Sequence, residues 1–330
     1  MGTTLNELSP NTGGEQMIDG RNKDPGRRSF WKTAPGLLTF SAIVLAAVGV
    51  WVIILVARPA ILDGLLPVAR KTPEPAVPSA QWLLTMRSPF VTAIEIGRSV
   101  QDRPINAVRL GTGSRTVVIA GAIHGSEVNT MRLVEQLAAR LADTAESLPR
   151  DVSLFLVPGL NPDGLAKRSR DNAHGVDLNR NWATNNWRVD AAQSPQGPQG
   201  TGGPSPFSEP ETAASSAWLL TLRDQSTTRL SVIIYHSACP PKGLVQPGYR
   251  IVGGRQETDP NAAKLGQYWA NQLGYPYSPT WPEYPITGEA IHWCAENHIT
   301  CIDIELPTAN DPTAAEVQLH LSALSDMIQE

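Results

Sequence analysis

Four short apolar runs, rich in β-branched residues, lie in the C-terminal three quarters of the chain. They are Arg115–Ala120, Val152–Val157, Leu230–Tyr235 and Thr300–Ile304. Continuous apolar runs of this length are typical of strands that are buried on both faces of a sheet. The pattern therefore predicts four core strands.

Helical patterns lie between these runs. The segment from about 127 to 145 carries its apolar residues on one helical face, at Val128, Met131, Val134, Leu137 and Leu141. Ser208-Glu209-Pro210-Glu211 has the form of a capping box and predicts a helix through 213–222, and Asp311-Pro312 predicts the start of a last helix. The alternation predicts an α/β fold with a mainly parallel or mixed central sheet flanked by helices.

A longer apolar segment precedes this region. Residues 36–57, GLLTFSAIVLAAVGVWVIILVA, contain no charge and would span roughly 33 Å as a helix, enough to cross a bilayer. The segment is longer than the apolar region of a signal peptide, so a retained transmembrane signal-anchor is the preferred interpretation. A cleaved signal peptide is the alternative.

The charges around this segment predict its orientation. Basic residues are concentrated before it, at Arg21, Lys23, Arg27, Arg28 and Lys32. This bias favours a cytoplasmic N-terminus and a folded domain outside the cytoplasm, at the cell membrane. We expect residues 1–35 to form a disordered cytoplasmic tail, 58–80 a Pro-rich linker and 81–330 the folded domain.

Composition excludes some classes of function. The net charge of -4 over 330 residues, with no basic block in the C-terminal part, argues against nucleic acid as a partner. The cysteines Cys239, Cys294 and Cys301 include no CxxC pair, so a thiolate zinc site is not expected. A Cys294–Cys301 disulfide and two buried free thiols both remain open.

Polar residues follow each apolar run. His124 and Glu127 follow the first, Asn161-Pro-Asp-Gly164 the second, His236 the third and Glu305 the fourth. In open α/β sheets, ligands bind beyond the carboxyl ends of the strands. We therefore expect these side chains to meet at one edge of the sheet.

Two histidines and a carboxylate at this edge have the composition of a catalytic zinc site, which keeps a fourth position for water. A lone H-x-x-E is a weak signal, and His236 taken alone would be interpreted as a core histidine with one hydrogen bond. The small residues Gly125 and Ser126 allow close approach of backbone or ligand. Together the strand-end residues favour a metal site.

The ordered motifs resemble one known family. H-x-x-E, NPDG, the R-x-N of Arg170–Asn172, GVDLNRNW, a strand-end histidine and the glutamate of IELP are similar to the zinc metallocarboxypeptidases of the carboxypeptidase A/B type. The resemblance runs from about Ile94 to the C-terminus. Shorter bacterial members, including murein peptide amidases, are the most similar in length and loop pattern.

The resemblance implies a role for each strand-end residue. His124, Glu127 and His236 would bind one Zn²⁺ per chain, which activates water and polarises the scissile carbonyl. Glu305 would be the general base that takes a proton from water and passes it to the leaving amine. A surface carboxylate is the alternative for Glu305.

Further residues acquire roles from the same resemblance. Asp177 would orient His124, and Arg170 would stabilise the oxyanion, with a solvated basic loop as the alternative for Arg170. Asn179 and Arg180 would bind the free C-terminal carboxylate of the substrate, because the planar guanidinium offers two parallel hydrogen bonds. Such a clamp makes the enzyme an exopeptidase.

The last two assignments concern specificity. The family carries a mobile tyrosine followed nine residues later by tryptophan, as Trp293 follows Tyr284, so Tyr284 would close over the substrate. A packing tyrosine is the alternative. In the same register Ile291 falls at the floor of the family's specificity pocket, which implies a neutral or apolar leaving side chain.

These expectations describe a membrane-anchored zinc carboxypeptidase that cleaves the C-terminal amide bond of peptides or of cell-wall stem peptides. One alternative is a small-molecule deacylase of the aspartoacylase type, which also uses H-x-x-E and a distant histidine. The other is a catalytically dead binding domain tethered to the membrane. The complete set of ligands, base and clamp favours the peptidase.

Overall fold

The computed structural model describes residues 91–190, 193–194, 197–198 and 200–329. The expected tail (1–35), transmembrane segment (36–57) and linker (58–80) all lie outside these residues. Within the part of the chain that the structure describes, no helix is long and apolar enough to cross a membrane.

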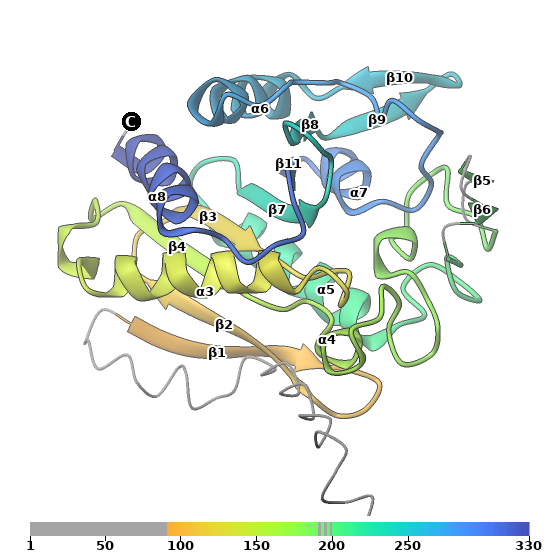
Figure 1. The fold of residues 1–330 in the computed structure, drawn as a ribbon, viewed down its shortest axis with the longest axis horizontal. Helices are drawn as coiled ribbons and strands as arrows, with labels where there is room; N and C mark the ends of the chain where they lie inside the picture. Colours follow the sequence, from red (N-terminus) through yellow and green to blue (C-terminus); the bar gives the residue numbers. More distant parts are fainter. Residues whose placement is uncertain (1–90, 191–192, 195–196, 199, 330) are drawn as a thin grey trace, which may run out of the picture. The chain divides into compact units, whose positions relative to one another are not determined.

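A seven-stranded mixed sheet forms the centre of the fold, in the order β1-β2-β4-β3-β7-β11-β8 (Figure 1). The strands are β1 Val91–Arg98, β2 Pro104–Leu110, β3 Arg115–Ala120, β4 Val152–Val157, β7 Ser231–Ser237, β8 Leu244–Pro247 and β11 Thr300–Leu306. The four inner strands β4, β3, β7 and β11 run parallel, and antiparallel pairing attaches β1 and β2 on one side and β8 on the other. The predicted α/β class with a mixed sheet is confirmed.

The four predicted strands are the four inner strands. β3 and β4 have the predicted bounds, whereas β7 starts one residue later and both β7 and β11 run two residues further. The extension matters because His236 and Glu305 pair across the two parallel strands and so belong to the sheet itself. Backbone pairing continues beyond the apolar run, so the two polar side chains stand on rigid strands.

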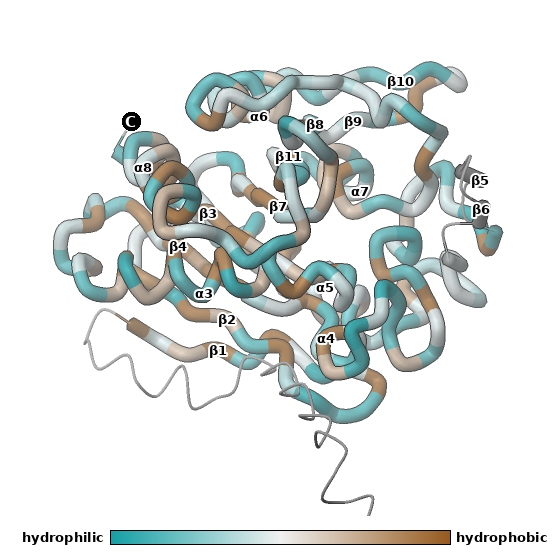
Figure 2. Tube along the Cα trace, in the orientation of Figure 1, coloured by the Kyte–Doolittle hydropathy of each residue, from teal (hydrophilic) through white to brown (hydrophobic). Residues whose placement is uncertain are grey.

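Helices cover both faces of this sheet. They are α3 Val128–Ala142, α4 Pro162–Lys167, α5 Pro210–Gln225, α6 Pro260–Leu273, α7 Ala290–Glu296 and α8 Ala314–Gln329, with 3₁₀ turns at Ala145–Ser147 and Leu178–Arg180. Two short hairpins, β5 Gln193–Ser194 with β6 Gly197–Pro198 and β9 Tyr249–Val252 with β10 Arg255–Thr258, complete the described elements. Figure 2 shows hydrophobic residues gathered on the inner strands, between the helices.

The core divides into two layers because neighbouring strand residues face opposite sides. Val117 and Ile119 of β3 pack with α3, α6 and α8, whereas Val118 and Ala120 pack with α5 and α7. The apolar face predicted for α3 is buried along its length. This double burial explains why the inner strands are apolar throughout rather than alternating.

Two predicted helix starts need correction. Helix α5 begins at Pro210 after Glu209, and Ser208 makes no capping bond; its hydroxyl donates to Glu209 instead, at 2.8 Å. The carboxylate of Glu211 is drawn away from the cap because it accepts from Asn172 Nδ2 at 3.2 Å and Val100 N at 3.2 Å. A carboxylate already engaged by another loop does not turn back to cap its own helix.

The last helix begins at Ala314 rather than at Asp311-Pro312. Its capping box is formed by Thr313 and Glu316: Thr313 N donates to Glu316 Oε2 at 2.7 Å, and Glu316 N donates to Thr313 Oγ1 at 3.2 Å. Asp311 instead pairs with Arg132 of α3. The cysteines Cys294 and Cys301 are both buried free thiols, so the disulfide alternative is not the one observed.

Candidate functional site

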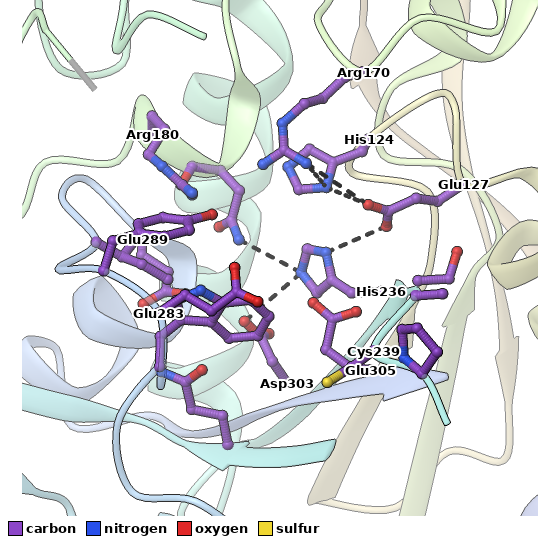
Figure 3. A pocket seen from close by; sticks show the side chains of 18 residues that line it. His124, Glu127, Arg170, Arg180, His236, Cys239, Glu283, Glu289, Asp303 and Glu305 are labelled. Carbon is purple, nitrogen blue, oxygen red and sulfur yellow. Dashed lines mark hydrogen bonds and ion pairs between the residues drawn. The ribbon is translucent and has the colours of Figure 1, made fainter. Parts of the chain in front are cut away.

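Three predicted ligands meet at the carboxyl ends of β3 and β7. His124 lies in the loop after β3, Glu127 precedes the first residue of α3, and His236 lies on β7. His124 Nδ1 is 2.7 Å from Glu127 Oε1, and His236 Nδ1 is 3.3 Å from Glu127 Oε2 (Figure 3). One ligand atom from each residue lies within 4.8 Å of the other two, and all three residues are buried.

The donor set fits zinc. Burial raises the pKa of Glu127, but the charges of His124 and His236 outweigh it and lower that pKa to about 2. Two imidazoles and one ionised carboxylate that converge on one point match a catalytic zinc site with an open fourth position. The predicted zinc cofactor is confirmed for this His-Glu-His site.

The NPDG segment holds the loop that carries His124. Asn161 Oδ1 accepts from Gly164 N at 2.8 Å, and Asn161 Nδ2 donates to Ile123 O at 3.3 Å. A Cβ on Gly125 would lie 1.9 Å from the carbonyl carbon of Gly164, so α4 packs directly on this loop. Gly125 therefore provides room for the backbone of α4.

Asp177 lies behind His124, away from the metal position. Its Oδ1 is 3.1 Å from His124 Nε2, and its Oδ2 accepts from Arg170 Nε at 2.9 Å. Burial raises the pKa of Asp177, but the charges of Arg170 and His124 outweigh it and hold that pKa well below its usual range. An ionised Asp177 fixes the imidazole with Nδ1 toward the other ligands.

The triad opens into a cavity of about 420 Å³. Besides the triad, the predicted residues that line it are Arg170, Asn179, Arg180, Tyr284 and Glu305. Glu305 lies directly across from His236 in the strand register. Burial, together with the charge of Glu127, raises the pKa of Glu305 to about 8.

Two arginines approach the cavity from the segment that follows α4. Arg170 leans over the triad, with Nη1 3.3 Å from His124 Nδ1. Arg180 is held by a bond from its Nη1 to Asn179 O at 2.7 Å, and Asn179 Oδ1 accepts from Ala290 N at 3.0 Å. The structure thus brings the proposed clamp, Asn179 and Arg180, next to the triad.

The two specificity residues are placed differently. Tyr284 lies at the cavity wall, where its ring meets that of Trp281 edge-on at 6.1 Å. Ile291 is fully buried in α7 and packs in the core, and it is not among the described residues that line the cavity. The expectation of a neutral or apolar leaving side chain rested on Ile291 and therefore has no support from the cavity lining.

Acidic and amide side chains missed by the sequence reasoning line the same cavity: Gln246, Glu283, Glu289 and Asp303. Asp303 precedes Glu305 by two positions on β11, so the strand period of two would have placed both on one face. Burial, with the charges of Glu289 and Glu305, raises the pKa of Asp303 well above its usual range. Burial raises the pKa of Glu289 to about 7, although Arg180 lowers it.

Comparison with known proteins agrees with this geometry. Residues 80–320 match the sequence model of the zinc carboxypeptidases, peptidase M14. Murein peptide amidase A of Escherichia coli K12 is 28% identical over 244 residues, which cover 69% of this chain and 86% of that relative.

Solved structures show the same fold. The crystal structure of a murein-tripeptide amidase from Escherichia coli O157 superimposes with a TM-score of 0.51 at 23% identity, covering 72% of this chain and 92% of the other. The carboxypeptidase A of Helicoverpa armigera superimposes with a TM-score of 0.57 at 22% identity, covering 74% and 67%.

Proposed function

Because the chain belongs to the zinc carboxypeptidase family, we propose that it releases the C-terminal residue of peptides, with cell-wall stem peptides among its substrates. The observation that carries the proposal is the single cavity that joins the His-Glu-His triad, Glu305 and the Asn179–Arg180 pair. A metal triad and a base suit hydrolysis, and an adjacent arginine suits recognition of a free carboxylate. The cavity contains all the parts that an exopeptidase needs.

Each residue has a defined task in this reaction. A bound zinc ion supplies Lewis acidity and lowers the pKa of a water molecule. Glu305 accepts the proton of the attacking water and passes it to the leaving amine, a role that its raised pKa of about 8 favours. Arg170, above the triad, donates to the oxyanion, and Asp177 holds His124 in place.

The substrate binds through its terminal carboxylate. Arg180 is nearly fully buried but lines the cavity, where its guanidinium can meet a ligand. A desolvated guanidinium binds a carboxylate strongly, which fixes the scissile bond at one residue from the chain end. Tyr284 would then close over the bound residue from the cavity wall.

Two further points extend the proposal. The murein peptide amidase relative supports stem peptides as substrates. We also propose that residues 36–57 anchor the chain in the cell membrane, with the N-terminus in the cytoplasm and the catalytic domain outside. That arrangement would place the cavity beside the cell wall.

The test uses the full-length chain loaded with zinc and a panel of peptides, including γ-D-Glu–diaminopimelate, each as the free acid and as the C-terminal amide. We expect cleavage of the acids alone, reduced about 10²- to 10⁴-fold in Glu305→Gln. Equal cleavage of amides would contradict the exopeptidase. Cleavage of N-acetyl-aspartate alone would favour the deacylase, and no cleavage of any substrate by zinc-loaded protein would favour a binding domain.

A further inference from the structure

A second cavity lies at the opposite end of the parallel strands, and no step of the proposed reaction uses it. Its volume is about 430 Å³, close to the 420 Å³ of the catalytic cavity. The first residues of β3, β7 and β11 line it, together with the turn before β7 and parts of α6 and α8. Because Ser231 precedes His236 by five residues on β7, about 17 Å separates the two cavities along that strand. A ligand bound here would not touch the zinc triad.

The floor of this cavity is a row of residues across three strands. In the parallel registers, Ser231 of β7 lies opposite Val117 of β3 and opposite Thr300 of β11. The residues two positions further along each strand pack in the core layer that contains α6 and α8, so the row faces the same helices. Ser231 and Thr300 are small, which leaves space between the sheet and the helices at this end.

Positive charge is concentrated around this space. The cations that line it are Arg115 at the start of β3, Arg229 before β7 and Lys264 on α6, and none of the described residues that line it is acidic. The catalytic cavity, in contrast, is lined by five carboxylates and two arginines. In a chain with a net charge of -4, three cations around one space indicate a site for an anion.

Two of these cations are held in place by aspartates outside the cavity lining. Arg229 Nη2 is 2.7 Å from Asp259 Oδ2, and Arg115 Nε is 2.8 Å from Asp151 Oδ2. The arginine side chains are nevertheless 30% and 24% exposed, and neither Nη1 group donates a hydrogen bond to a described residue. Each guanidinium is therefore fixed in position and still has a donor for a ligand.

Lys264 and the polar side chains near it are uncommitted. Lys264 is exposed and forms no ion pair with any described residue. The side chains of Thr228, Ser231 and Asn261 line the cavity and form no hydrogen bond within the described part of the chain. The amides at the start of α6 are not needed for the site, because Asp259 already accepts from two of them at 3.0 Å. An anion would therefore be bound by side chains.

The donors and the shape of the cavity favour a phosphate group that carries an apolar portion. A phosphate monoester has about 1.5 to 2 negative charges at pH 7 and three acceptor oxygens, which three separate cations can share. A carboxylate has one charge and is best matched by a single arginine fork. Val117, Leu265 and Met327 give the cavity an apolar side, against which an alkyl chain can pack.

We propose that this cavity binds an amphiphilic phosphate monoester, with the phosphate on Arg115, Arg229 and Lys264 and the alkyl portion against the apolar side. The proposal is independent of the proposed peptidase activity. A soluble phosphate ester and a lipid headgroup both offer this chemistry, and the experiments below separate the two sources.

Calorimetry with the full-length zinc-loaded chain compares butyl phosphate with three probes that each lack one feature. Inorganic phosphate lacks the alkyl chain, pentanoate replaces the phosphate with a carboxylate, and butanol lacks the charge. We expect butyl phosphate to bind at least about 10-fold more tightly than each of them. Pentanoate binding as tightly as butyl phosphate would overturn the proposal, and so would the absence of saturable binding of butyl phosphate.

Substitutions then locate the bound phosphate. Lys264→Gln should weaken the binding of butyl phosphate about 10-fold, whereas Arg255→Gln, which removes one positive charge from the exposed strand β10, should bind as wild type. Normal binding in Lys264→Gln together with lost binding in Arg180→Gln would place the phosphate in the catalytic cavity and overturn the proposal. Binding is measured without turnover, so the result stands whether or not the chain hydrolyses peptides.

Vesicles separate the two sources of phosphate. The full-length chain is reconstituted in phosphatidylcholine vesicles that contain phosphatidic acid or, at matched surface charge, phosphatidylserine, and butyl phosphate is titrated into both. A lower affinity beside phosphatidic acid, with no such difference in Lys264→Gln, would identify a lipid headgroup as the competing ligand. Equal affinity in the two kinds of vesicle would identify a soluble ester.

Discussion

Asp177 shows how one buried carboxylate serves two neighbours. It is fully buried, and its two oxygens are divided between His124 and Arg170. Removing the negative charge would weaken the hold on the imidazole and leave the guanidinium without its counter-charge. The zinc ligand and the proposed oxyanion donor therefore depend on the same residue.

We predict that Asp177→Asn lowers zinc affinity about 10- to 100-fold, because the amide cannot hold His124 in the liganding orientation as strongly. Competition with a chelator of known affinity measures the change. Asp143→Asn, at the exposed end of α3, should leave zinc binding as in wild type. Unchanged affinity in Asp177→Asn would show that His124 is oriented by its surroundings instead.

Residues at the ends of apolar runs were predictable from their position, and Arg170, Asn179 and Arg180 were predictable from the family resemblance. A polar residue within an apolar run, or one brought to the cavity only by packing, was not predicted. His124, His236 and Glu305 follow recognisable strands, so their convergence could be expected. Asp303 lies inside the run Thr300–Ile304, where apolar neighbours conceal a polar position. Glu289, the residue before α7, reaches the cavity through the packing of that helix against the sheet, which no local sequence pattern reveals.

At the scale of elements, the contact between the His124 loop and α4 determines the geometry of the metal site. The sequence identified the His124 loop and the NPDG motif, but it predicted neither the helix α4 nor its packing against the loop. A Cβ at position 125 would lie 2.3 Å from Leu165 N as well as 1.9 Å from the carbonyl carbon of Gly164, and these backbone atoms cannot move without displacing α4. Glycine at this position is thus a requirement of helix packing.

Gly125→Ala should therefore destabilise the protein by about 3 kcal/mol and abolish zinc binding, because the added methyl forces the loop and α4 apart. Chemical denaturation and metal analysis measure the two effects. Gly253→Ala is a suitable control: Gly253 has φ of 56° but open space around it, so only backbone strain of about 1 kcal/mol is expected. A Gly125→Ala protein that binds zinc normally would contradict this account.

Helix starts were less predictable than helix faces. The buried face of α3 follows from a period that averages over many residues, whereas each cap depends on one or two side chains. Glu211 and Asp311 would cap their helices in isolation, but Asn172 and Arg132 of other segments engage them instead. Side chains from distant segments, which the tertiary fold brings close, therefore decide which residue caps each helix.

At the scale of the whole molecule, helix α8 is attached to the sheet through a buried histidine. His320 Nδ1 is 2.9 Å from the hydroxyl of Tyr235 on β7, and the ring is 1% exposed. Burial lowers the pKa of His320 to about 4, although Glu316 raises it slightly. The folded protein therefore keeps this histidine neutral at pH values where the unfolded chain would protonate it.

This difference predicts acid destabilisation. The pKa of His320 in the folded protein lies below the ordinary value of 6.5. The free energy of unfolding is therefore unaffected by protonation of this residue above pH 6.5, and it falls as the pH drops from 6.5 toward 4, because the unfolded chain binds a proton that the folded protein does not. The loss should reach about 3 kcal/mol in the free energy of unfolding. Denaturation of wild type and His320→Gln across this range should show their stabilities converging by about that amount, and His298→Asn, at an exposed position, should follow wild type. Parallel curves for wild type and His320→Gln would contradict the prediction.

Strand β11 presents Glu305, the proposed base, and Asp303 to the same cavity, while Ile304 between them packs in the core on the other face of the sheet. Substitution and insertion would therefore have different effects on this strand. A substitution at position 303 changes the lining of the cavity and leaves Glu305 in place, whereas one residue inserted or deleted between 303 and 305 would turn one of the two side chains away from the cavity. During divergence, the lining of the cavity can change by substitution, but the spacing between these two positions cannot change.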